Sequence, residues 1–359
     1  MKTVLIGVGQ AGGKVTSALV DFDREMGFDA IRGALAVNSA KADLQPLQID
    51  TVLVGQDRVN GHGVGGDNEL GAEVMEADAG QVMSELDGRI TAEAEAIVVV
   101  AGLGGGTGSG GAPILARELS NVYDVPVYAI GILPGSNEGA MYQVNAGRSL
   151  KTLAREADAV LLIDNDAWHS SGESIEEGFD AINEAIAQRV GLLMASGEAV
   201  EGVGESVVDT SEIINTLRAG GIASLGYASA QAGDDSDANV NVVTSVTRNA
   251  VLTGASLPNA TAAETGLVVL AGRPENISRK GVESARSWVE EETGSMRVRG
   301  GDFPLDSDRI AALVLLGGVE RSERVEEFMD RAREAQERDD EPEEDPAETF
   351  QTDELDDLI

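Results

Sequence analysis

The chain has 359 residues, of which 42% are hydrophobic, and it carries 63 acidic against 26 basic residues, a formal net charge of −37 at pH 7. Such a negative surface repels nucleic acid, and no apolar run approaches the ~20 residues that a membrane helix needs. The absence of cysteine excludes disulfides and thiolate metal sites. We therefore expect a cytoplasmic protein with no signal peptide, no nucleic-acid partner and no direct membrane insertion.

The acidic residues are spread over the whole chain rather than confined to one end. At 1 M salt the Debye length falls to about 3 Å, so that such a surface no longer repels its own copies. The pattern favours adaptation to a very salty cytoplasm. The alternative is an acidic surface that docks on a basic partner.

Residues 1–172 alternate short apolar segments with helical stretches. The segments predict strands at 3–8, 35–38, 51–54, 96–101, 125–132 and 159–163, with helices at 12–26, 70–86 and 112–122 among them. Continuously apolar strands that alternate with helices are typical of a parallel sheet buried on both faces. We therefore predict an α/β fold with a doubly wound, Rossmann-like first domain.

A long helix is predicted at residues 173–197. Ser174 followed by Glu177 matches a capping box, and Gly197 is a typical helix stop. Apolar residues recur every three or four positions, at Ile175, Phe179, Ile182, Ile186, Val190 and Leu193. Because this helix lies between blocks of different pattern, we expect it to join two domains.

Residues 198–320 predict a smaller α+β domain, with strands at 239–252, 265–272 and 309–317 and a helix at 280–292. A charged helix is predicted from 321 to about 338. The remaining residues to 359 are rich in acids and lack Lys and Arg, which predicts disorder. This tail is either simply solvated or a docking motif for a protein partner.

The first of two glycine-rich loops is GVGQAGGK. Gly7, Gly9 and Gly12 match the pattern G-x-G-x-x-G between a strand and a helix, which brings a pyrophosphate close to the backbone. An NAD site would also need an acid at the end of the next strand, where this chain has Asn38. A P-loop would need Ser or Thr where Val15 stands. The loop therefore indicates a phosphate site of another kind.

The second loop, AGLGGGTGSGG at residues 101–111, follows a buried strand and precedes a helix. Its glycines bring backbone N–H groups close to a ligand, and Thr107 and Ser109 add hydroxyl donors at the positive end of the helix. A flexible turn is the alternative interpretation. Two such loops on one sheet predict one extended phosphate site.

GGGTGSG, residues 104–110, resembles the signature of the tubulin/FtsZ superfamily of polymerising GTPases, and the resemblance extends from residue 1 to about 318. The composition and the GQAG loop make the chain most similar to the haloarchaeal CetZ group. The resemblance implies a GTP-binding domain at 1–172, a linking helix at 173–197, a C-terminal α+β domain at 198–320 and a tail at 321–359. It also implies GTP or GDP with Mg²⁺ as cofactors.

The resemblance implies a set of nucleotide-binding residues, which are Gly9, Gln10, Ala11, Gly12, Gly13, Lys14, Asn38, Gly104, Gly105, Gly106, Thr107, Gly108, Ser109, Glu138, Asn165, Phe179 and Asn183. Gln10 would lie near Mg²⁺. A loop at residues 60–71 would lie near the γ-phosphate, and its His62 is a weak candidate for a catalytic base.

The resemblance also assigns the ribose and the base. Glu138 would accept hydrogen bonds from the ribose, and Asn165 would contact the ribose or the base. Phe179 would stack on guanine and Asn183 would pair with its edge, because a spacing of four puts both on one helix face. Core packing for Phe179 and a solvated position for Asn183 are the alternatives. The chain departs from FtsZ at Ala140, where FtsZ has Arg.

Residues 207–217 resemble the loop that reaches the nucleotide of a neighbouring subunit. Glu212, supported by Asp209, would position and activate the attacking water. The alternative is an ordinary helix cap with a first-turn acid. Val207 stands where FtsZ has Asn.

The sequence therefore predicts a tubulin-like cytoskeletal GTPase that polymerises head-to-tail with itself, hydrolyses GTP at the subunit interface and controls cell shape. One alternative is a nucleotide-binding filament or scaffold with little turnover. Another is an NAD- or flavin-linked enzyme, against which Asn38 and the second glycine loop argue.

Overall fold

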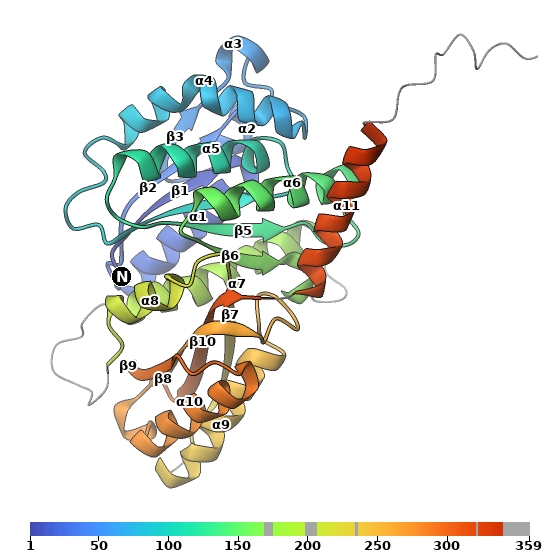
Figure 1. The fold of residues 1–359 in the computed structure, drawn as a ribbon. Coiled ribbons are helices and arrows are strands. Elements are labelled where there is room, and N and C mark those ends of the chain that lie inside the picture. The colour runs from blue at the N-terminus through green and yellow to red at the C-terminus, as the bar shows by residue number, and fades with distance from the viewer. Residues whose placement is uncertain (169–174, 198–206, 234–235, 321, 340–359) are drawn as a thin grey trace, which may run out of the picture.

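The computed structural model describes residues 1–168, 175–197, 207–233, 236–320 and 322–339. Its described strands form one ten-stranded sheet in the order β3-β2-β1-β4-β5-β6-β7-β10-β8-β9. Figure 1 shows the parallel half of this sheet in the upper part of the molecule and the remaining strands in the lower part.

The first six strands run parallel to one another and confirm the predicted α/β fold. They are β1 (Thr3–Val8), β2 (Ile31–Asn38), β3 (Asp50–Leu53), β4 (Ala96–Gly102), β5 (Val127–Leu133) and β6 (Ala159–Asp164). The chain leaves β1 toward β2 on one side and leaves β4 toward β5 on the other. The carboxyl ends of β1 and β4 therefore form a topological switch point, which is where open α/β sheets bind ligands.

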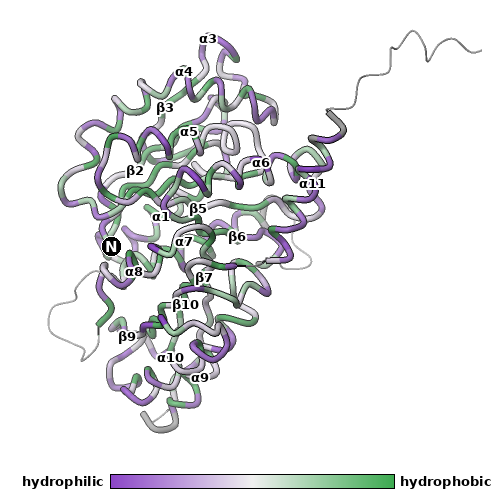
Figure 2. The backbone as a smooth tube through the Cα atoms, in the orientation of Figure 1, coloured by the Kyte–Doolittle hydropathy of each residue, from purple (hydrophilic) through white to green (hydrophobic). Residues whose placement is uncertain are grey.

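Helices cover both faces of this parallel half. They are α1 (Gly9–Met26), α2 (Lys41–Leu44), α3 (Gln56–Val59), α4 (Asn68–Leu86), α5 (Thr107–Val122) and α6 (Ala140–Glu156). Leu19 of α1 belongs to the core on one face of the sheet. Met75, Leu115 and Leu150 of α4, α5 and α6 belong to the core on the other face. Figure 2 shows the hydrophobic residues along the central strands and hydrophilic stretches on the outer helices.

The long helix α7 (Ile175–Ser196) confirms that the predicted segment is helical, and it packs beside α1. Ile182, Ile186 and Val190 of its apolar stripe are buried. The capping residue Ser174 lies outside the described residues.

The second half contains α8 (Thr210–Leu217), β7 (Ile222–Gln231), α9 (Ser236–Leu252), β8 (Ala263–Gly272), a 3-10 turn (Pro274–Asn276), α10 (Arg279–Thr293), β9 (Val298–Pro304), β10 (Arg309–Val319) and α11 (Glu323–Asp339). Another 3-10 turn, Asn165–Trp168, directly follows β6 in the first half. β10 is antiparallel to both β7 and β8. A short parallel pairing of β7 with β6 continues the sheet from the first half.

The prediction of a strand at residues 239–252 is wrong, because this segment lies in α9. Its valines and threonines have high strand propensity, but Val243, Val246 and Ala250 are buried at spacings of three and four residues. Packing of one helical face onto the sheet thus overrides local propensity. Within the described residues, no helix is both long and apolar enough to cross a membrane.

Candidate functional site

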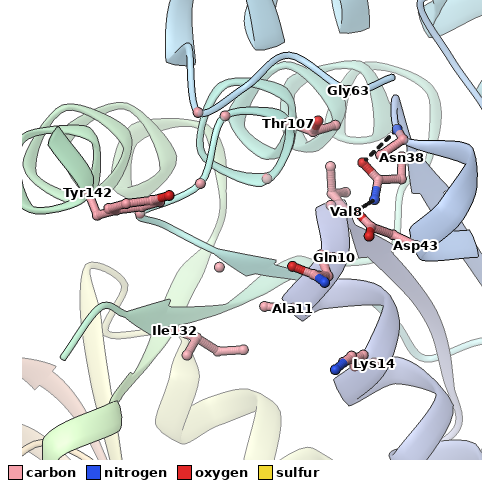
Figure 3. Close-up of a pocket in the computed structure, with 18 of the residues that line it drawn as sticks. Val8, Gln10, Ala11, Lys14, Asn38, Asp43, Gly63, Thr107, Ile132 and Tyr142 are labelled. Carbon is pink, nitrogen blue, oxygen red and sulfur yellow. Dashed lines mark hydrogen bonds between the residues drawn. The ribbon is translucent and has the colours of Figure 1, made fainter. Parts of the chain in front are cut away.

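A cavity of about 770 Å³ opens at the carboxyl ends of the parallel strands. Its wall begins at Val8, where β1 ends, and continues through the loops that follow β2, β4, β5 and β6 to α7. Figure 3 shows 18 of the residues that line it. The volume falls within the range of cavities that hold small molecules and cofactors.

The structure brings most of the predicted binding residues together in this wall. Those that line the cavity are Gly9, Gln10, Ala11, Lys14, Asn38, Gly104, Gly105, Gly106, Thr107, Gly108, Glu138, Asn165, Phe179 and Asn183. Gly12, Gly13 and Ser109 do not line it. Gly12 packs against β4, where an added Cβ would lie 2.1 Å from the Val100 carbonyl oxygen. Ser109 Oγ accepts a hydrogen bond of 2.8 Å from Asn68 Nδ2, which ties the second loop to the start of α4.

Two helix N-termini meet at one end of the cavity. α1 begins at Gly9 and α5 begins at Thr107, each directly after a strand or its loop. Gly9 has a φ of 75°, and an added Cβ there would lie 2.8 Å from the Gly108 backbone nitrogen. The two loops thus touch. Because each helix N-terminus presents unpaired N–H groups and a positive dipole end, this end favours an anion.

The loop at residues 62–66 forms a further part of the wall. Asn145 of α6 ties it to the second glycine loop, since its Nδ2 donates to the Gly66 carbonyl at 2.8 Å and to the Gly104 carbonyl at 3.0 Å. Sequence reasoning missed Asn145, because α6 itself was not predicted. His62 lies in the wall and is exposed.

The other end of the cavity carries aromatic and amide side chains. Phe179 and Asn183, one turn apart on α7, are half-buried in its wall. Glu138 is held at the wall because its Oε1 accepts from the Gly135 backbone N–H at 2.8 Å. Tyr142 adds a second aromatic ring, which sequence reasoning missed. Its signal was an aromatic residue three positions after Gly139.

The charges in the wall are few. Among the lining residues, Lys14 is the one Lys or Arg, against the carboxylates of Asp43 and Glu138. Figure 3 shows Lys14 and Thr107 well apart along the cavity. Asn38 is engaged within the protein, since its Nδ2 donates to Asp43 Oδ2 at 3.0 Å and its Oδ1 accepts from the Ser39 N–H at 2.8 Å. Backbone N–H groups, rather than cationic side chains, would therefore hold most of an anion's charge.

The described residues include no group of three or more His, Cys, Asp or Glu that could hold a metal ion. A divalent cation here would take most of its ligands from water and from a bound phosphate chain, as Mg²⁺ commonly does. The Gln10 side-chain oxygen, in the wall beside the anion end, fits a single oxygen ligand.

Asp209 and Glu212 do not line the cavity; they lie at the start of α8. Asp209 is the N-cap, and its side chain accepts from Ser211 Oγ at 2.5 Å and from the Glu212 N–H at 3.1 Å. Hydrogen bonds from the Ser211 hydroxyl and from the backbone amides of Glu212 and Ser211 hold the pKa of the Asp209 carboxyl below its usual range. Burial raises the pKa of the neighbouring Glu212 carboxyl. The capping role considered for Asp209 is thus present.

α8 lies at the amino ends of the parallel strands, opposite the cavity. Thr210 Oγ1 donates to Glu95 Oε2 at 3.0 Å, and the same oxygen accepts from the Lys2 N–H at 2.7 Å, just before β4 and β1 begin. Figure 1 shows α8 beside the N-terminus. The six residues of β1 separate this edge from the cavity by about 20 Å. One subunit therefore cannot bring Glu212 to its own cavity.

Replacement of Asp209 by alanine is expected to lower the free energy of unfolding by about 1 kcal/mol at pH 7, through loss of the N-cap. Because the folded-state pKa of Asp209 is depressed, this contribution is present above the unfolded pKa of about 3.9 and is lost as pH falls through the lower folded value. Chemical denaturation of both proteins from pH 7 to 3 measures it. Ser278, the uncharged N-cap of α10, provides the control, since Ser278→Ala should cost the same at each pH. A pH-independent loss for Asp209→Ala would contradict the assignment.

Comparison with known proteins gives two family matches. Residues 2–173 match the GTPase domain of the tubulin/FtsZ family, and residues 172–334 match the C-terminal domain of tubulin-like CetZ. The chain is 72% identical over 360 residues to tubulin-like protein CetZ2 of Haloferax volcanii, covering 100% of both proteins.

Solved structures of CetZ and FtsZ proteins are similar to this chain in fold. CetZ2 from Haloferax volcanii, as a GTPγS-bound protofilament, has a TM-score of 0.91 and 72% identity, covering 94% of this chain and 99% of that one. CetZ1 from the same organism, as a GDP-bound monomer, has a TM-score of 0.87 and 50% identity, covering 94% and 100%. An FtsZ dimer from M. jannaschii, at 20% identity, a TM-score of 0.71 and coverage of 89% and 88%, shows the shared fold. With both halves matched and full-length identity this high, the chain belongs to the tubulin/FtsZ family and, within it, to the tubulin-like CetZ proteins.

Proposed function

We propose that this protein is a cytoskeletal GTPase that assembles head-to-tail and hydrolyses GTP where two subunits meet. The observation that carries the proposal is that two incomplete sites lie at opposite ends of the parallel strands. The cavity lies at the carboxyl ends of these strands, and Glu212 lies at their amino ends. Stacking one subunit on the next brings the two together. Such a heterologous contact extends into an open filament.

In this proposal the triphosphate lies at the N-termini of α1 and α5, against residues 104–108. Glu138 accepts hydrogen bonds from the ribose. Phe179 stacks on guanine and Asn183 pairs with its edge, because the Asn amide both donates and accepts. Asn165 contacts the ribose or base from the end of β6. Mg²⁺ held near Gln10 would add to the positive charge of Lys14 and of the two helix N-termini, and would stabilise charge on the phosphates.

Glu212 of the next subunit positions the attacking water and accepts its proton. Burial raises the pKa of its carboxyl, which makes it a stronger base than an exposed glutamate. Asp209 supports it indirectly, since it caps the helix on which Glu212 lies. The GTPγS-bound CetZ2 protofilament and the GDP-bound CetZ1 monomer support this cycle, in which GTP favours assembly and GDP favours release.

The specific activity of the GTPase is expected to rise with protein concentration, because an isolated subunit lacks Glu212 at its cavity. Phosphate release at ~2–3 M KCl, where the surface charge is screened, measures it. Light scattering in the same samples should rise over the same concentration range. At low salt, a charge of −37 per subunit opposes stacking, and both signals should fall. Activity per subunit that stays constant would contradict hydrolysis at the interface.

A nucleotide-binding scaffold with little turnover is a second candidate. Val207, half-buried at a backbone bridge with Asp302, brings no polar side chain to the α8 edge. Constant, very low phosphate release alongside normal assembly would favour this candidate.

The domain division and the cellular role complete the proposal. Residues 1–172 form the GTP-binding domain, 173–197 the linking helix, 198–320 the C-terminal domain and 321–359 the charged helix and tail. Membership of this chain in the CetZ group supports a cytoplasmic filament that controls cell shape. The tail partner proposed from the sequence concerns residues 340–359, which lie outside the described residues.

A further inference from the structure

The helix α11 returns from the end of the C-terminal half to pack on α6 of the first half. Phe328 of α11 is fully buried. An added Cβ at Gly147 of α6 would lie 2.5 Å from the Phe328 carbonyl oxygen, so the two helices are in close contact there. Figure 1 shows α11 crossing the end of α6, far from α8.

Arg324, in the first turn of α11, makes the most extensive contacts of this helix with the first half. Its Nε donates to Asp164 Oδ2 at 3.2 Å, and its Nη2 donates to the Pro134 carbonyl at 3.2 Å and to Asp166 Oδ2 at 3.1 Å. The guanidinium carbon also lies 4.6 Å from the centre of the Phe328 ring. The side chains of Arg324 and Asp164 are 13% and 4% exposed, so solvent and salt screen this ion pair little.

These partners surround the loop at residues 134–138, which carries Glu138. Asp166, held by Arg324, accepts from the Ser136 backbone N–H through its Oδ2 at 2.7 Å. Arg324 therefore fixes this loop twice, through the Pro134 carbonyl and through the Asp166 carboxylate. Burial raises the pKa of Asp164 while Arg324 opposes that rise.

A second arginine reaches the same loop two turns further along α11. Arg331 Nη1 donates to Gln143 Oε1 at 2.8 Å, and Gln143 Nε2 donates in turn to the Gly135 carbonyl at 2.7 Å. A spacing of seven residues puts Arg324 and Arg331 on the same face of the helix. Gly135 also donates its N–H to Glu138 Oε1 at 2.8 Å, so this chain of hydrogen bonds ends at the carboxylate.

We propose that α11 positions the ribose-binding loop and that Arg324 and Arg331 are positioning residues for recognition of the ribose hydroxyls. The proposal rests on the proposed function, because it takes Glu138 as the acceptor for the ribose. None of the described residues that line the cavity belongs to α11. It acts by holding the loop backbone, and with it the Glu138 carboxylate, at the cavity wall.

The test compares the affinity for GDP with the affinity for 2′,3′-dideoxy-GDP, by calorimetric titration of the full chain at ~2–3 M KCl. The wild type is expected to prefer GDP by about tenfold or more, because the analogue lacks both hydroxyls that would donate to the Glu138 carboxylate. Arg324→Met should lower this preference toward one by weakening GDP binding alone. Arg324→Lys, which keeps the charge but not the forked donors, should restore part of it.

Arg333→Met is the matched control, because Arg333 lies on the same helix, is 68% exposed and pairs with Asp330. It should keep the wild-type preference. If Arg324→Met does not fold, Arg331→Met tests the exposed end of the same network and should lower the preference by a smaller factor. A wild type that binds no GDP would overturn the proposed function and this proposal with it. A wild type that prefers GDP, with Arg324 and Arg331 variants that prefer it equally, would overturn the role of α11 alone.

Discussion

Replacement of Glu212 by alanine is expected to lower GTP turnover by about 100-fold or more while leaving GTP affinity unchanged. The magnitude follows from the loss of a positioned general base, which typically contributes 10²–10⁴-fold. Binding should persist, because Glu212 lies on α8 at the edge of the sheet opposite the cavity. Phosphate release in ~2–3 M KCl, together with nucleotide titration, separates the two effects.

Two controls distinguish chemistry from assembly. Glu212→Gln keeps the size and the helix position of the side chain but cannot accept a proton, so it should lose turnover and retain light scattering. Asn215→Ala alters the same helix one turn further on and should retain turnover. If Glu212→Gln hydrolyses GTP at the wild-type rate, Glu212 is not the base.

The second large effect is expected at Gly105 in the second glycine loop. An added Cβ at Gly105 meets no atom within 4 Å, and the residue lines the cavity, so alanine should fold normally but project a methyl group into ligand space. Overpacking of this kind costs about 1–3 kcal/mol, which corresponds to roughly a 5- to 150-fold loss of nucleotide affinity. Titration with GDP and thermal unfolding of the ligand-free protein measure the two quantities.

Gly80 is the matched control, because an added Cβ at this exposed position of α4 also meets no atom within 4 Å. Gly80→Ala should raise stability, by about 1 kcal/mol for a helix interior, and leave affinity unchanged. Unchanged affinity in Gly105→Ala would mean that the phosphates do not lie against the second glycine loop.

The two variants also complement each other in the proposed filament. Gly105→Ala keeps Glu212 but binds nucleotide poorly, whereas Glu212→Ala binds nucleotide but lacks the base. In an equal mixture, about a quarter of the junctions pair an intact cavity with an intact Glu212, if subunits assemble at random in a head-to-tail contact. Turnover should therefore reappear on mixing. A mixture as inactive as its components would contradict a site shared between subunits.

The parallel half of the fold and the glycine loops could be predicted from sequence, because their signals are local. A buried strand such as β4 is a continuous apolar run, and a glycine cluster directly after it has few uses besides close backbone contact with a ligand. The spacing of Phe179 and Asn183 was likewise enough to place them on one face of α7.

The features that were predicted wrongly or missed depend on contacts between residues distant in sequence. α9 was predicted as a strand because its β-branched residues match a pleated surface, and only its packing on β7 and β10 shows the helical face. Asn145 and Arg324 carried no signal, since each acts through loops far along the chain. Arg324 reaches Asp164 across 160 residues.

That distance in sequence also fixes an order of events during synthesis. α11 follows every other described helix and strand, so Arg324 leaves the ribosome after the whole sheet has been made. Domains fold as units while a chain is being synthesised, N-terminal part first, and contacts between distant segments form late. A nascent chain therefore has both glycine loops in place before the loop at residues 134–138 is fastened by α11. In the proposed scheme, tight nucleotide capture, and with it entry into a filament, waits until α11 has docked on a completed subunit.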